Sequence, residues 1–242
     1  MISIIIPAKN EERLISLLLE SLKKQDCASE IEVVVADAHS TDKTREIIYS
    51  YKDFFKKVLV VDGGMPWTGR NLGAKASTGD LLVFIDADLV LPTSDFISKI
   101  QDDFKIRNLA IATVYLKPIS HKLIDHILVN SYNIILFLAQ FIRPLGAMCI
   151  ISTRSAFDKS GGYPEDVVMS EDHDFVLNAK KYGKYGIIHV VADISVRRFE
   201  KEGRFGLVSK YIYATYYRVV HGPIREPLFE YEFEYDNDSI KK

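Results

Sequence analysis

Residues 81–88 read Leu-Leu-Val-Phe-Ile-Asp-Ala-Asp, an apolar run that ends in two acidic residues. The apolar run from Leu81 to Ile85 predicts a buried strand. Asp86 and Asp88 follow it directly. Because alternate residues of an extended chain point the same way, their carboxylates can converge on one divalent cation that holds a diphosphate. The stretch therefore indicates nucleotide-diphosphate chemistry, although on its own an Asp-x-Asp triplet can also simply end a strand.

Strand and helix signals alternate along the first half of the chain in the manner of βαβ units. The predicted elements are strands at 2–6, 31–36, 58–61 and 81–85, and helices at 11–24, 40–51 and 70–76. Continuous β-branched strands with crossover helices predict a parallel sheet covered on both faces. We therefore expect an α/β protein with a Rossmann-like, mostly parallel sheet that binds its ligand outside the carboxyl ends of the strands.

The second half of the chain is less regular. The patterns predict helices at 95–107, 121–143, 171–182 and 205–221, and strands at 110–115, 148–152 and 187–191. No internal repeat and no linker is visible in the sequence. We expect a single domain over residues 1–242.

Composition narrows the classes of partner. The formal net charge of −2 gives no overall basic field, so nucleic acid is not an expected partner. The two cysteines match no metal-ligand spacing and favour a reducing compartment. Because no basic leader or cleavage site follows Met1, we expect a cytoplasmic protein.

Polar residues gather where three predicted strands end. They read Pro-Ala-Lys-Asn-Glu-Glu at 7–12, Asp-Ala-His-Ser-Thr-Asp at 37–42 and Asp-Ala-Asp at 86–88. On a parallel sheet these three sets share one edge. Asp37 could accept hydrogen bonds from a base or ribose, with a cap or turn as the alternative, whereas Asp42 is better explained as a helix cap.

Further motifs follow in order along the chain: Arg70-Asn71-x-Gly73, Thr78-Gly79-Asp80, Arg154, Phe157, Gly161-Gly162-Tyr163 and Glu171-Asp172-His173-Asp174. Together with the three strand-end sets, they make the chain resemble the family 2 glycosyltransferases with a GT-A fold. The resemblance covers roughly residues 1–200. It divides the expected domain into a nucleotide-sugar-binding half at 1–92, an acceptor-binding and catalytic half at 93–222 and a C-terminal tail at 223–242.

The resemblance also implies roles for single residues. Asp88, with Asp86, is expected to bind a divalent metal, Mn²⁺ or Mg²⁺. Asp172, or its neighbour Glu171, is expected to be the catalytic base. Residues implied to bind the nucleotide sugar are Pro7, Ala8, Asn10, Glu11, Asp37, Arg70, Asp86 and Ala87.

The Glu171-Asp172 pair suits an inverting transfer, in which a carboxylate removes the acceptor proton while a metal stabilises the departing diphosphate. Adjacent helical residues diverge by about 100°, so only one of the two should face the sugar. We favour Asp172. The alternative is a solvated acidic helix start that the helix dipole stabilises.

Two departures from the family pattern limit what it implies. Ala38 and His39 replace the second Asp and the Gly of the usual Asp-Asp-Gly-Ser sequence, so the base of the donor stays open. The Gln-x-x-Arg-Trp signature of processive synthases is absent from the sequence. We therefore expect transfer of one sugar. The rivals are a sugar-nucleotide nucleotidyltransferase and a noncatalytic nucleotide-sugar-binding protein.

Two further segments bear on the partners. Arg197 and Arg198 could clamp the leaving diphosphate or a phosphorylated acceptor, with a solvated face as the alternative. The apolar segment 127–142 is too short and too often interrupted by amides for a membrane span. It is expected in the core, in a homodimer interface, or in peripheral contact with the inner membrane face, where Lys122 and Arg143 could meet anionic headgroups and a lipid-linked acceptor could be presented.

Overall fold

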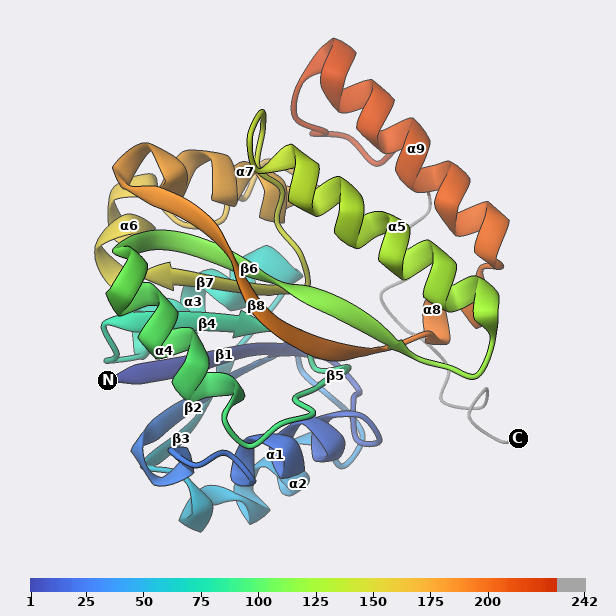
Figure 1. Ribbon diagram of the computed structural model, residues 1–242. Coiled ribbons are helices and arrows are strands. Elements are labelled where there is room, and N and C mark those ends of the chain that lie inside the picture. Colours follow the sequence, from blue (N-terminus) through green and yellow to red (C-terminus); the bar gives the residue numbers. More distant parts are fainter. Residues whose placement is uncertain (230–242) are drawn as a thin grey trace.

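The computed structural model describes residues 1–229 and shows a mixed α/β architecture built on one curled sheet (Figure 1). The eight strands of this sheet lie in the order β3-β2-β1-β4-β7-β6-β8-β5. In chain order they are β1 (Ile2–Ala8), β2 (Ile31–Asp37), β3 (Lys57–Asp62), β4 (Leu81–Ile85), β5 (Leu89–Val90), β6 (Leu109–Ile119), β7 (Cys149–Thr153) and β8 (Lys184–Ser195).

The helices are α1 (Ile15–Lys23), α2 (Thr44–Ser50), α3 (Pro66–Ala76), α4 (Phe96–Arg107), α5 (Leu123–Ala139), α6 (Arg154–Ser160), α7 (Glu171–Ala179), α8 (Arg197–Lys201) and α9 (Arg204–His221). Short 3₁₀ turns lie at η1 (Ala28–Glu30), η2 (Lys52–Phe54) and η3 (Lys180–Tyr182). Helix α3 begins four residues before the predicted Arg70, because Pro66 fits the first helical turn. The sequence did not predict α6, α8 or the two-residue strand β5.

Strands from the first half pair in parallel, as expected: β1 pairs with β2 and β4, and β2 pairs with β3. The second half extends the same sheet differently. Strand β7 lies antiparallel between β4 and β6, and β5 is antiparallel to β8, whereas β6 and β8 are parallel. Strands from both halves of the chain therefore share one sheet.

Helices cover both faces of this sheet. The alternation of side chains along β1 places Ile4 and Ile6 against α1, α2 and α4, and Ile5 against α3 on the other face. Helix α3 lies so close to β1 that a Cβ on Gly73 would stand 2.6 Å from Cγ2 of Ile5. The close approach explains the glycine.

The face that carries α3, α6 and α7 contains an aromatic cluster. Tyr163 stacks on Phe175 with ring centroids 4.3 Å apart, and Phe84 contacts both rings and Phe157. All four side chains are buried. The cluster links Phe84 of β4 to Phe175 of α7. It thereby fixes β4 and α7 relative to each other, and the ends of these two elements carry the acidic motifs.

Helix α5 packs on β6 but does not lie inside the core of the described chain. Among its side chains only Asp125, Val129 and Leu136 are buried, and much of its apolar surface is exposed. In the described part of the chain, no helix combines the length and the apolar character that crossing a membrane requires.

Candidate active site

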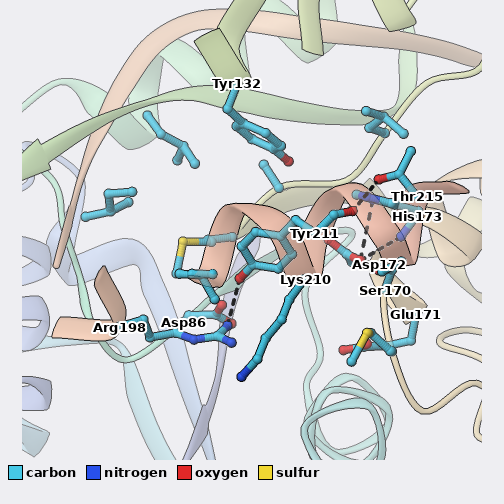
Figure 2. A pocket seen from close by; sticks show the side chains of 18 of the residues that line it. Asp86, Tyr132, Ser170, Glu171, Asp172, His173, Arg198, Lys210, Tyr211 and Thr215 are labelled. Carbon is cyan, nitrogen blue, oxygen red and sulfur yellow. Dashed lines mark hydrogen bonds and ion pairs between the residues drawn. The ribbon is translucent and has the colours of Figure 1, made fainter. Parts of the chain in front are cut away.

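Four predicted carboxylates surround one cavity of about 940 Å³. Asp86 and Asp88 enter it from the end of β4, and Glu171 and Asp172 enter it from the first turn of α7 (Figure 2). The pairs lie 83 residues or more apart in sequence. The antiparallel insertion of β7 beside β4, followed by α6 and α7, brings them to the same end of the sheet.

Arg70 joins the two carboxylate pairs. From the second turn of α3, its Nη2 donates to Oδ1 of Asp86 at 2.6 Å and its Nη1 donates to Oε1 of Glu171 at 2.9 Å. The guanidinium also lies over the ring of Tyr163. Because the side chain is largely buried, these charge-assisted bonds hold both carboxylates in place.

Arg197 makes a second bridge on the donor side. It donates from Nη1 and Nη2 to the two oxygens of Glu11, at 2.8 and 2.6 Å, and its Nε lies 3.4 Å from Oδ2 of Asp88. The start of α8, directly after β8, carries Arg197 back to the end of β1. The predicted diphosphate clamp thus contacts two of the predicted donor-site residues.

Asp88 is more buried than a carboxylate at the edge of a sheet would be, with a side chain only 6% exposed. Leu89 begins β5 directly after it, and the pairing of β5 with β8 covers it. Burial, together with the nearby carboxylates of Asp86 and Glu11, raises the pKa of Asp88 to about 7, although Arg197 opposes the shift. Asp88 in this arrangement favours a proton or a cation.

A divalent ion fits this donor set only in part. Within residues 1–229, no cluster of three His, Cys, Asp or Glu side chains is arranged to hold a metal by itself. Asp86 and Asp88 supply two carboxylates. Mg²⁺ is commonly bound by one or two carboxylates together with substrate phosphates and water, so the pair suits an ion that arrives with a diphosphate.

Glu171 and Asp172 differ in their partners. Glu171 is tied to Arg70, and burial raises its pKa even though Arg70 opposes the shift. Oδ1 of Asp172 accepts a hydrogen bond from the backbone N–H of His173 at 2.9 Å. Asp172 is not tied to Arg70, which supports the expectation that the two carboxylates face different groups.

The predicted nucleoside loops, residues 7–12 and 37–42, do not line this cavity, and they bind each other. Oδ1 of Asn10 accepts from the backbone N–H of Thr41 at 2.9 Å, and Ser40 Oγ accepts from the N–H of Asn10 at 2.9 Å. Asn10 and His39 both adopt left-handed conformations, with φ of 52° and 57°. His39 thus takes the backbone conformation that glycine favours, at a cost of about 1 kcal/mol.

Asp37 is fully buried at the end of β2. It pairs with Nε of Arg45 at 2.8 Å and accepts from the N–H of Ser40, which matches the turn reading. Asp42 precedes Lys43, the N-cap of α2; its Oδ1 accepts from the N–H of Thr44, and its Oδ2 accepts from the N–H of Glu12 in the other loop. Pro7 and Ala8 end β1, and Ala87 lies between Asp86 and Asp88; none of the three lines the cavity.

Sequence reasoning missed several residues of the cavity. Trp67, Tyr132 and Ser170 line it beside the carboxylates, and Ser170 adopts a left-handed φ of 59° just before α7. Tyr132 lies across the cavity from the acidic residues (Figure 2). Periodicity assigned it to a helix but gave no signal that its hydroxyl, which donates to the carbonyl of Gly146, borders the site.

Arg198 lies apart from its neighbour Arg197. It contacts Glu202 and donates from Nη1 to the hydroxyl of Tyr211 at 2.9 Å (Figure 2). Arg198 lines the cavity on the side of α9, whereas Arg197 lies at Glu11, so the two arginines are in different parts of the structure.

Some motif residues are structural. Asn71 exchanges hydrogen bonds with the backbone of Tyr163, and Arg154 donates to the carbonyls of Ala74, Ser77 and Gly79. They hold the end of α3 against β4 and the turn before α7. Motif membership therefore does not by itself place a residue in the site.

The model of the family described as glycosyl transferase family 2 matches residues 3–161. The chain belongs to this family. This is a family of glycosyltransferases and not one of sugar-nucleotide nucleotidyltransferases.

Relatives and structural neighbours agree with the family and with the fold. The poly(ribitol-phosphate) β-N-acetylglucosaminyltransferase TarS of Staphylococcus aureus is 40% identical over 101 residues, which are 40% of this chain and 17% of TarS. A poly(ribitol-phosphate) β-glucosyltransferase of Bacillus spizizenii is 28% identical over 205 residues, or 79% of this chain and 31% of that protein. The chain thus spans less than a third of either relative.

Two solved structures share the fold at low identity. The mannosyltransferase PcManGT of Pyrobaculum calidifontis, in complex with GDP-Man and Mn²⁺, has a TM-score of 0.67 and 21% identity over 88% of this chain and 64% of its own. TarS residues 1–349 in complex with UDP-GlcNAc has a TM-score of 0.65 and 20% identity, over 80% of this chain and 58% of that one. The α/β fold expected from the sequence, of the GT-A type, is confirmed.

Proposed function

We propose that this chain is an inverting, metal-dependent transferase that moves one sugar from a nucleotide-diphosphate sugar to a hydroxyl of a lipid-linked or phosphorylated acceptor. The observation that carries the proposal is the placement of two carboxylate pairs on one cavity, joined by Arg70. One pair lies where the strand ends of such sheets bind ligands. The other pair can serve the acceptor.

On the donor side, Arg70 and Arg197 bind the diphosphate, because their guanidinium groups suit phosphate oxygens. Asp86 and Asp88 would hold Mn²⁺ or Mg²⁺, which supplies positive charge to the departing diphosphate when bound. The nucleoside is assigned to the loops with Pro7, Ala8, Asn10, Glu11, Asp37 and Ala87. The structurally similar mannosyltransferase binds GDP-Man and Mn²⁺, which supports a nucleotide-diphosphate sugar and a divalent metal as the ligands.

On the acceptor side, Asp172 takes the proton of the acceptor hydroxyl while the hydroxyl oxygen attacks the anomeric carbon and the bond to the diphosphate breaks. Glu171 is held by Arg70 and positions the donor-side carboxylate Asp86 through it. Asp172 lines the cavity and is not bound to Arg70. Both facts support this division of roles.

Matched isosteric variants test the division. Asp172→Asn should retain donor binding and lower turnover by roughly 10²-fold or more, because the amide cannot accept the proton. Glu171→Gln is the control and should lower turnover less. Should Glu171→Gln alone abolish turnover, the base is Glu171, and if neither variant affects turnover the proposed mechanism is wrong.

A further inference from the structure

Large apolar side chains lie exposed along α5, on the turn that follows it and along α9. In the first segment they are Leu123, Ile127, Ile134, Ile135, Phe137, Leu138, Phe141 and Ile142, and on α9 they are Phe205, Tyr211, Ile212, Tyr213, Tyr216, Val219 and Val220. These side chains are between 45% and 87% exposed, although Tyr213 also contacts the ring of Phe229. We call this surface the α5/α9 face. Exposed apolar surface of this extent marks a site of interaction.

Two ion pairs, together with the buried Leu207 and Ala214, hold α9 in place beside α5 (Figure 1). At its first residue, Arg204 donates to both oxygens of the buried Asp125 of α5, at 2.6 and 3.0 Å. Near its other end, Arg218 donates to both oxygens of Asp174 of α7 at 2.9 Å. Such two-point pairs fix the position of a helix whose apolar residues remain available.

The cavity of the active site continues between these helices. The wall that carries Asp86 and Asp172 at one end also includes Ile135 of α5 and Val208 and Ile212 of α9. Ile135 and Ile212 belong to the α5/α9 face as well. An apolar passage therefore connects the carboxylates to the exposed face. A surface that only joined two copies of the chain would not require this passage.

Positive charge flanks the same face. Lys122 precedes α5 and the exposed Arg143 follows it, at a separation of about 30 Å if each helical residue rises about 1.5 Å. Lys210 lines the cavity from α9 (Figure 2). Lys201 of α8 is also exposed, whereas Arg197, Arg204 and Arg218 are paired with Glu11, Asp125 and Asp174. Apolar side chains bordered by cations are typical of surfaces that bind anionic bilayers.

We propose that the α5/α9 face docks on an anionic bilayer and that the acceptor is an amphiphile drawn from it. Its hydrocarbon part lies in the passage between Ile135 and Ile212, and its hydroxyl reaches Asp172. The identity of the acceptor rests on the proposed function, whereas docking on the bilayer does not depend on it.

Flotation with vesicles tests the docking. The full chain is mixed with vesicles of phosphatidylcholine alone, or with phosphatidylglycerol added at about one part in four to supply negative charge. We expect binding to the anionic vesicles that weakens at high salt. Phe141→Glu with Ile142→Glu, at side chains 73% and 87% exposed and outside the cavity, should lower the partition coefficient at least tenfold.

Ile106→Glu is the matched control, because Ile106 is 80% exposed on α4, away from the α5/α9 face (Figure 1). It should bind vesicles like the unmodified chain. A protein that stays in the soluble fraction with both kinds of vesicle overturns the docking proposal. So does a stable dimer, by light scattering, that Phe141→Glu with Ile142→Glu dissociates, since a second copy then covers the face.

A pair of acceptors tests the passage: one glycoside with a short alkyl chain and the same glycoside with a long one. The longer acceptor should have the lower KM, and Ile212→Glu should remove at least tenfold of that preference. Equal use of both acceptors overturns the passage. An unmodified chain that does not hydrolyse the donor would instead contradict the proposed function. Failure of the passage and failure of the proposed function therefore give different results.

Discussion

Replacing Arg70 by Met removes the one cation that bonds to both Asp86 and Glu171, at 2.6 and 2.9 Å. Methionine keeps the hydrocarbon part of the side chain, but two largely buried carboxylates lose their cationic partner. Breaking a buried pair costs about 3–5 kcal/mol. We expect the lower end, about 3 kcal/mol, because Asp86 is about a quarter exposed and water can reach it.

The loss of unfolding free energy in Arg70→Met should depend on pH, and its direction follows from the pKa of Glu171. Burial already raises the pKa of Glu171, and without Arg70 the pKa of Glu171 rises further. A carboxyl whose folded-state pKa lies above its unfolded value of about 4.3 contributes stability that is fully present below that value and is lost as pH rises through the folded pKa. Arg70→Met should therefore be less destabilised at pH 5.5 than at pH 8.

Urea unfolding followed by circular dichroism measures this. With an m-value of about 3 kcal/mol/M, the midpoint at pH 8 should fall by about 1 M. Arg225→Met is the matched control, because Arg225 and its partner Asp166 are both exposed, and its midpoint should hardly move. A midpoint for Arg70→Met equal to that of the unmodified chain, or a loss that does not change between the two pH values, would refute the reasoning.

Two further predictions concern stability, and one concerns the donor site. Burial alone would raise the pKa of Glu32, but hydrogen bonds from Ser3, Thr78 and Lys57 lower it. The stability that ionised Glu32 contributes is therefore lost as the pH falls below about 4.3. In an acid titration, Glu32→Gln should lose less unfolding free energy with falling pH than the unmodified chain loses. Phe175→Ala removes a fully buried ring from the aromatic cluster and should cost about 3–5 kcal/mol in chemical unfolding, and a loss under 1 kcal/mol would contradict the packing described. Asp88→Asn should abolish the Mn²⁺-dependent thermal shift given by a nucleotide sugar while the fold persists, and an unchanged shift would remove Asp88 from the metal site.

The sequence predicted the parts of this molecule that depend on local patterns. The apolar run 81–85 is strand β4, and the strand-end sets meet at one edge because parallel strands align their ends. Helix α5 was placed within a few residues, but periodicity alone could not tell whether its apolar surface is inside or outside. That outcome depends on what packs against it.

Contacts between distant segments lay beyond sequence reasoning. Arg197 and Glu11 are 186 residues apart, and Arg70 and Glu171 are 101 apart. Their meeting follows from the antiparallel insertion of β7 and from the return of the chain after β8, neither of which a hydrophobic pattern encodes. The family motifs marked Arg70 and Glu171 separately but gave no sign that one would bind the other.

The anomeric configuration of the sugar released from a donor tests the central claim most directly. The full chain, with Mn²⁺, is incubated without acceptor with α-linked donors such as UDP-glucose, UDP-GlcNAc and GDP-mannose, and the first sugar anomer released is followed by proton NMR before mutarotation. An inverting enzyme must release the β anomer first, at a rate that Asp172→Asn lowers. Release of the α anomer first, or a rate that Asp172→Asn leaves unchanged, would contradict the account.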